Sequence, residues 1–188
     1  MKHLAMIALS FTALTIGGCG KKAETAASET PSGAADAGMN AASPPAMATS
    51  PGQAFANAAA ASDAFEIESS QLAENKATSA KVKSFAAQMI KAHTESTTKL
   101  KTAASSASPA ITPDAALTDM QRQTLADLGA KTGADFDAAY IKAQVEAHQA
   151  TLDAVKTYSA NGEVGPLKTL ATALVPVVTA HFNMAKGL

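Results

Sequence analysis

A histidine recurs inside the apolar stripe of several helices that this sequence predicts. The pattern is clearest in residues 82–100, where the stripe positions are separated by steps of three or four: Val82, Phe85, Met89, His93, Thr97 and Leu100. Steps of this size place residues on one face of an α-helix. Charged residues fall mostly on the other faces, so the stretch predicts an amphipathic helix with one histidine on its buried side.

Two later segments repeat this arrangement. Residues 134–160 carry a stripe of Ile141, Val145, His148, Leu152 and Val155. Residues 164–186 carry a second stripe, which continues to the end of the chain: Leu167, Leu170, Leu174, Val177, His181, Met184 and Leu188. Both patterns predict long amphipathic helices with a histidine facing the core.

An earlier helix is predicted over residues 55–76, with a glutamate in the equivalent place. Glu68 lies three residues after Phe65 and four before Leu72, so we expect Glu68 to face the core and Glu66 to point elsewhere. Ser79 is the predicted N-cap of the helix that contains His93. A short further helix is predicted over 118–128, with Thr118 as its N-cap.

Four long amphipathic helices with short links predict an all-α protein, a ferritin-like up-down four-helix bundle. The short extra helix lies between the second and third long helices. The chain has no Trp and few aromatic residues, and an Ala-rich core of this kind suits closely packed helices. We assign the bundle to one domain, residues 53–188.

The first 18 residues are typical of a bacterial export signal. An apolar run follows Lys2, and Ile16-Gly17-Gly18-Cys19 resembles a lipoprotein box. Cys19 is the only cysteine of the chain, so no internal disulfide is expected. We therefore expect Cys19 to be acylated and to anchor the mature protein in a membrane of the cell envelope, facing the periplasm.

Residues 19–52 predict a disordered tether after this anchor. The segment is rich in Ala, Ser, Thr, Pro and Gly and has almost no large apolar residue, so it cannot bury enough surface to fold. The formal net charge of the whole chain is −1, and no basic cluster marks a nucleic-acid partner. The expected partner is the membrane, and any protein partner is undefined.

The buried polar residues form the candidate site: Glu68, His93, His148 and His181. Three interpretations are open. They are a hydrogen-bonded polar layer that fixes helix register, a site for copper, zinc or iron, and a core that becomes unstable when its histidines are protonated. Met89 and Met184 lie one helical turn from histidines and are secondary candidate ligands, which favour copper.

No catalytic residues are predicted. The Glu-x-x-His pattern of di-iron ferritins is absent, because the residues three before the core histidines are Ile90, Val145 and Val178. The sequence also lacks a Gly-rich phosphate loop and paired cysteines.

Four blocks resemble the bacterial family called domain of unknown function 4142, often labelled "predicted outer membrane protein". They are residues 66–73, 82–93, 136–153 and 174–188. The resemblance implies a ferritin-like bundle and no established activity. Members often have Asp directly before two of the histidines, where this chain has Ala92 and Ala147. That difference removes two potential metal ligands.

The sequence favours a lipid-anchored, non-enzymatic envelope protein with a binding or stress-related role. The alternative is a metal-binding or metal-dependent redox protein that uses the core histidines and Glu68.

Overall fold

A computed structural model describes residues 49–188 of the chain. This part is all-α and contains no strand, which confirms that the protein is helical as predicted. The helices are α1 (Pro51–Lys76), α2 (Ala80–Ser105), α3 (Asp119–Gly129), α4 (Gly133–Asn161) and α5 (Gly165–Lys186). Within these residues no helix combines the length and apolarity that crossing a bilayer requires. The predicted export signal, Cys19 and all but the end of the predicted tether lie outside the described residues.

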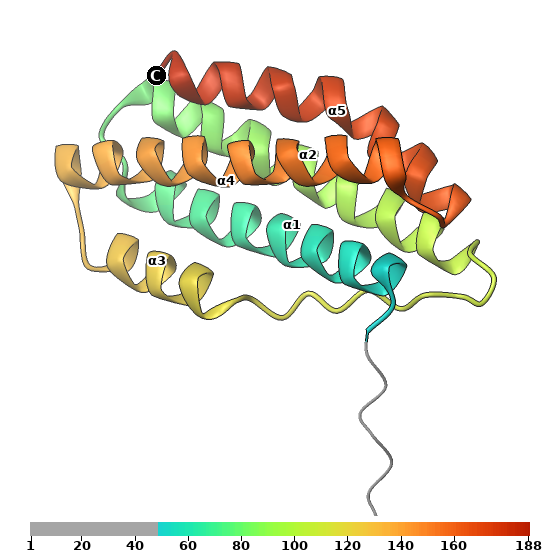
Figure 1. The fold of residues 1–188 in the computed structure, drawn as a ribbon. Helices are drawn as coiled ribbons and strands as arrows, with labels where there is room; N and C mark the ends of the chain where they lie inside the picture. Colours follow the sequence, from blue (N-terminus) through green and yellow to red (C-terminus); the bar gives the residue numbers. More distant parts are fainter. Residues whose placement is uncertain (1–48) are drawn as a thin grey trace, which may run out of the picture. The chain divides into compact units, whose positions relative to one another are not determined.

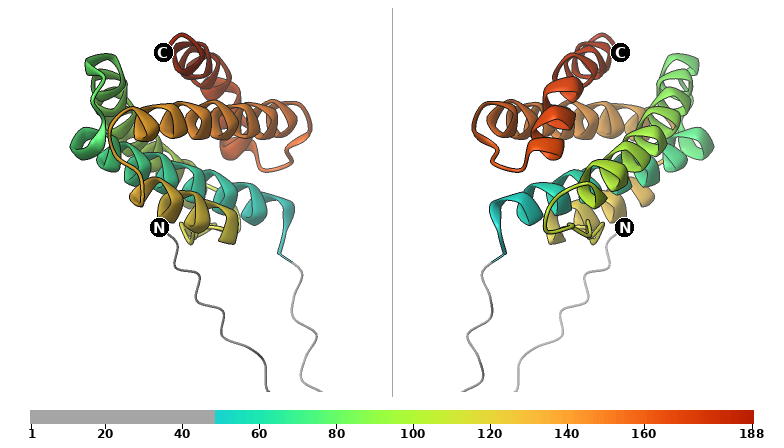
Figure 2. Two further views of the ribbon diagram at one scale, coloured as in Figure 1. Left: turned by 90° about the vertical axis from the view of Figure 1, so that its left-hand side faces the viewer. Right: turned by 90° about the vertical axis from the view of Figure 1, so that its right-hand side faces the viewer.

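The four long helices lie side by side, and each contacts two of the others. Helix α1 packs against α2 and α4, and α5 packs against the same two helices, so the contacts form a closed ring. The short α3 lies on the outside of this ring, against α1 and α4 (Figure 1). Figure 2 shows the same arrangement from its two ends. The interior of the domain is therefore enclosed by α1, α2, α4 and α5.

Polar side chains fix where several helices begin. Ser50 caps α1 by accepting a hydrogen bond from the backbone N–H of Gln53, and α1 starts at Pro51, within the predicted tether. The predicted N-caps of α2 and α3 are confirmed, since Ser79 accepts from Val82 and Thr118 forms a reciprocal capping box with Gln121. Such caps supply partners to backbone N–H groups that a helix leaves unpaired.

The segment between α2 and α3 runs along α1. The Gln53 Nε2 donates to the carbonyl oxygen of Thr112 at 2.6 Å, and the Asp114 N–H donates to the Asn57 Oδ1 at 2.9 Å. These contacts hold the long link against α1, and the link leads to α3, which packs beside α1 and α4 (Figure 1).

The core consists of two apolar clusters with a polar layer between them. One cluster contains Phe65, Met89, Tyr140 and Ala185, and the other contains Ala60, Leu100, Leu152 and Val178. In each long helix one buried Asp or His lies between the residues of the two clusters: Asp63, His93, His148 and His181. Glu66 lies directly after Phe65 of the first cluster. The order of the clusters reverses from α1 to α2 and again from α4 to α5, as expected for antiparallel neighbours.

Candidate metal centre

Three histidines from three helices meet in the polar layer. His93 comes from α2, His148 from α4 and His181 from α5, and their ring centroids lie 5.6–5.7 Å apart in every pair. The rings are 6%, 1% and 9% exposed, respectively. The prediction that all three face the core is therefore confirmed. One nitrogen from each ring lies within 4.8 Å of the other two, a grouping that can hold a metal ion.

Hydrogen bonds fix the tautomers of two rings. The Nδ1 of His93 lies 2.8 Å from the Oδ1 of Asp63, and the Nδ1 of His148 lies 2.8 Å from the carbonyl oxygen of Gln144. Carboxylate and carbonyl oxygens accept hydrogen bonds, so both Nδ1 atoms carry the proton and donate it. In the neutral rings, each Nε2 then keeps a lone pair for a metal. Metal-binding histidines usually donate their second nitrogen in this way.

One nitrogen of each ring is buried and has no hydrogen-bond partner. These nitrogens are the Nε2 of His93, the Nε2 of His148 and the Nδ1 of His181. Leaving a buried polar atom unpaired costs about 1–3 kcal/mol, so three at one point require an explanation. A triangle with sides of at most 4.8 Å has its centre within about 2.8 Å of each nitrogen, whereas a metal–imidazole bond is about 2.0–2.1 Å. Movements of less than about 1 Å per ring would complete such a site.

Two acidic residues of α1 border the histidines, and neither was predicted as a site residue. Asp63 holds His93 and also accepts a hydrogen bond from the Oγ1 of Thr97 at 3.3 Å. Glu66 is 1% exposed, and its Oε1 lies 3.7 Å from the Nδ1 of His148. Both carboxylate oxygens of Glu66 lack a hydrogen-bond partner. The layer therefore contains buried carboxylates as well as histidines.

The prediction that Glu68 faces the core is wrong. Glu68 is exposed, while Glu66, which we expected to point elsewhere, is buried. The buried face of α1 is built mainly from small and polar residues, including Ala56, Ala60, Ser69 and Ala73. The stripe of Phe65 and Leu72 suggested a different phase, but Leu72 is only partly buried. The sequence signal for the correct buried face was the recurrence of Ala, Asp, Glu and Ser at steps of three and four along α1.

The two methionines have different surroundings. Met89 is fully buried, one turn before His93, and belongs to an apolar cluster. Met184 is 39% exposed, because Ala185 occupies the buried position next to it. The prediction that Met184 lies in the buried stripe is therefore wrong, and Met184 is a poor candidate for a ligand inside the core. Met89 packs as an apolar core residue of that cluster.

The surroundings shift the pKa values of the three histidines in two directions. Burial lowers the pKa of His148 and of His181 to about 4, so both rings are neutral at pH 7. Burial also opposes protonation of His93, but its hydrogen bond to Asp63 and the negative charges of Glu66 and Asp63 outweigh burial and raise its pKa. Burial raises the pKa of Glu66 to about 7. A cation at the layer would therefore find neutral rings at His148 and His181 and would compete more strongly with protons at His93.

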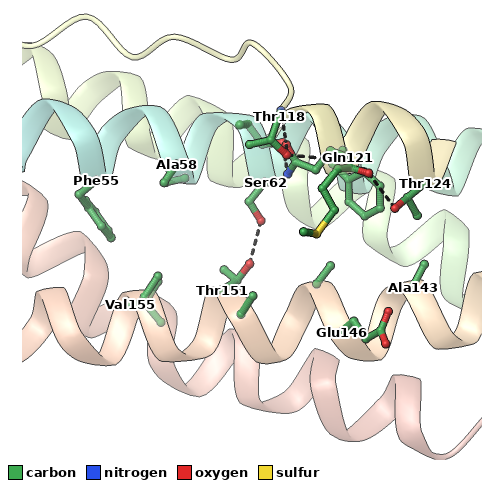
Figure 3. Close-up of a pocket in the computed structure, with 17 residues that line it drawn as sticks. Phe55, Ala58, Ser62, Thr118, Gln121, Thr124, Ala143, Glu146, Thr151 and Val155 are labelled. Carbon is green, nitrogen blue, oxygen red and sulfur yellow. Dashed lines mark hydrogen bonds between the residues drawn. The ribbon is translucent and has the colours of Figure 1, made fainter. Parts of the chain in front are cut away.

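Two cavities lie near this layer. A cavity of about 210 Å³ is lined by His93, His181 and Asp63, together with exposed residues of α2 and α5. A larger one, of about 360 Å³, lies between α1, α3 and α4 and is lined mostly by Ala and Phe (Figure 3). Two of the three clustered histidines line the smaller cavity, and none lines the larger one.

A family model described as a domain of unknown function, DUF4142, matches residues 37–188. The chain therefore belongs to this family, as the resemblance predicted. No curated protein is similar enough in sequence to count as a relative.

The fold is similar to that of solved structures of CopM. These are CopM in the Cu(I)-bound form (17% identity, TM-score 0.59), in the Cu(II)-bound form (17%, 0.61) and in a silver-bound form (19%, 0.59). Each alignment covers 72% of this chain and 93% of CopM. At this identity the likeness concerns the fold alone.

Proposed function

We propose that this protein binds copper through His93, His148 and His181, as a non-enzymatic protein of the cell envelope. One observation carries the proposal: three buried histidines from three helices bring one nitrogen each to within 4.8 Å of one another, and each ring has a buried nitrogen without a hydrogen-bond partner. A polar layer that only fixes helix register would be expected to pair these nitrogens with each other or with the backbone. A metal ion satisfies all three at once.

The donor set favours copper or zinc among the common metals. Imidazole is a good ligand for both, and the affinity of nitrogen ligands is highest for Cu²⁺ in the first-row divalent series. Three donors and no protein thiolate fit a three-coordinate Cu(I) site, or a Cu(II) site with further small ligands. The copper-bound and silver-bound forms of CopM, which has a similar fold, support the choice of copper over zinc.

Charge in the layer also supports a cation. Asp63 and Glu66 are buried beside the histidines, and an isolated buried carboxylate is costly. A bound cation would offset these negative charges and favour the ionised form of Glu66. Asp63 would orient His93 and increase its basicity, as carboxylates commonly do for metal-binding histidines.

The test is a competition titration between the protein and a chromophoric copper chelator. The chain carries Cys19→Ser, so that the cysteine contributes no thiolate. His93→Leu is expected to lower copper affinity at least about 100-fold while the helical circular dichroism is retained. The control is Glu68→Gln, which removes the exposed glutamate and is expected to leave affinity unchanged. Equal affinity of His93→Leu and the control would reject this site.

The envelope location rests on the predicted acylation of Cys19. Several acyl chains on one residue form a stable anchor, whereas a single chain is marginal. Wild-type protein is expected to fractionate with membranes, and Cys19→Ser to appear in the soluble periplasmic fraction. If Cys19→Ser fractionates with membranes like wild type, the anchor is not this cysteine.

We further propose that the domain is a ferritin-like, up-down four-helix bundle whose cofactor site differs from that of the di-iron proteins. The support is the closed ring of contacts among α1, α2, α4 and α5 and the reversal of cluster order between neighbouring helices. Absence of the Glu-x-x-His pattern favours a metal-binding role without oxygen chemistry.

A further inference from the structure

The cavity of about 210 Å³ connects the histidine layer with the surface between α2 and α5. Its inner wall contains His93, His181 and Asp63, which are buried. Its outer part contains Glu95 and Lys99 of α2 and Val177 of α5, which are exposed. We call this cavity the α2–α5 cleft. His148 does not line it and is the least exposed of the three histidines, at 1%.

This geometry gives the three rings different access to solvent. Two of the unpaired nitrogens belong to rings on the cleft wall, and the third lies deeper in the layer. An ion arriving through the cleft would meet His93 and His181 before His148. The cleft side of the ion would then carry no protein nitrogen. Three protein ligands with an open fourth position distinguish exchangeable and reactive metal sites from closed structural sites.

We propose that the α2–α5 cleft is the route by which the ion enters and leaves, and that it leaves one coordination position open to a small monodentate ligand. The inference rests on the proposed function, because it requires an ion at the three histidines. The ligand class comprises water and small anions, since a cavity of about 210 Å³ has room for several water-sized molecules beside the ion.

The larger cavity is the competing route. Ser62 and Thr151 line both cavities, and their hydroxyl oxygens form a hydrogen bond of 2.8 Å across the boundary from α1 to α4. Figure 3 shows this bond spanning the gap between the two helices. An ion coming from the larger cavity would have to break this bond to reach the histidines, whereas the cleft already has His93 and His181 on its wall.

The first experiment measures how fast Cu(II) binds and dissociates in stopped flow, with the full chain carrying Cys19→Ser as the reference. Ser96→Phe places a ring in the cleft at a half-buried position. It is expected to slow binding and release at least about tenfold each, with the equilibrium affinity changed less than about threefold. Thr98→Phe, on the exposed side of the same helix, is the matched control and is expected to bind at the reference rate.

A second variant tests the competing route. Ala150→Phe fills part of the larger cavity from an exposed position and is expected to leave both rates unchanged. Slowing by Ala150→Phe with no slowing by Ser96→Phe would overturn the proposal. If Ser96→Phe does not fold, Ala92→Phe, also half-buried on the cleft wall, takes its place.

The second experiment probes the open position with azide. Azide added to the Cu(II)-loaded protein is expected to produce a new charge-transfer band within the mixing time, and Ser96→Phe to delay it. A loaded protein whose spectrum azide leaves unchanged would show a closed site and overturn the proposal. A reference protein that takes up no copper would instead reject the proposed function, so the two failures are distinguishable.

Discussion

Glu66 makes the stability of the metal-free protein depend on pH. Its carboxyl is buried without a hydrogen-bond partner, and burial raises its pKa to about 7 from an ordinary 4.5. A carboxyl with a raised pKa binds its proton more tightly in the folded state. Its contribution to stability is therefore complete below about pH 4.5 and is lost as the pH rises through about 7.

The size of this effect follows from the difference in pKa. At about 1.4 kcal/mol per pKa unit, the raised pKa of Glu66 corresponds to a loss of about 3 kcal/mol between acidic and alkaline pH. Glu66→Gln keeps the shape of the side chain and removes its titration. Between pH 5 and 8.5 we expect wild type to lose about 2–3 kcal/mol relative to Glu66→Gln, so that the variant is the more stable protein at pH 8.5.

Urea unfolding of both proteins in the presence of a metal chelator, at several pH values, measures this difference. Glu68→Gln is the matched control, because Glu68 is exposed and its replacement is expected to leave the pH profile of wild type unchanged. Parallel pH profiles for Glu66→Gln and wild type would refute the reasoning, since they would show that Glu66 ionises without cost in the fold.

Three further predictions concern the site and the core. Asp63→Asn is expected to weaken copper binding at pH 8.5 about 10–100-fold in a chelator competition, because His93 loses its orienting carboxylate; an unchanged affinity would contradict that role. Copper affinity is expected to fall as the pH is lowered, beginning above pH 6.5, because the raised pKa of His93 lets protons compete early; an affinity constant from pH 8 to 6 would exclude His93 as a ligand. Leu100→Ala is expected to lower the free energy of unfolding in urea by about 2–5 kcal/mol, since Leu100 is 1% exposed. Met120→Ala, at a position that is 79% exposed, is expected to lower it by less than about 0.5 kcal/mol. Similar losses for both variants would contradict the core assignment.

Helical periodicity predicted α2 and the second half of α4 well because large apolar residues mark their buried faces. Ile141 and Val145, which belong to the predicted stripe of α4, are only partly buried. The steps through Val82, Phe85 and Met89 lead directly to His93, and those through Leu152 and Val155 lead back to His148. Any residue in register with such a stripe is buried with it. This is why His93 and His148 could be placed from the sequence alone.

The same reasoning failed where small or polar residues form the buried face. Helix α1 buries Asp63 and Glu66, so a search for large apolar residues selected the wrong phase and therefore Glu68. In α5, the buried residues include Val178 and Ala185, while Val177 and Met184 of the predicted stripe are exposed. The prediction relied on large apolar side chains to mark the buried face, whereas the packing of the helices determines which residues are buried.

The carboxylate partners could not be identified from spacing within a helix. Asp63 meets His93 across 30 residues of sequence, through the packing of α1 on α2. That contact depends on how the two helices are rotated about their axes, which the periodicity of one helix does not determine. The pairing was therefore visible only in the structure.

The most direct test of the account is the metal content of the purified chain carrying Cys19→Ser, measured by elemental mass spectrometry after exposure to equal amounts of copper, zinc and iron and removal of free metal. The account predicts about one copper per chain in the reference protein and almost none when His93, His148 and His181 are replaced together in a variant that keeps its helical content. A reference protein that retains no metal, or a triple variant that retains as much copper as the reference, would contradict the central claim.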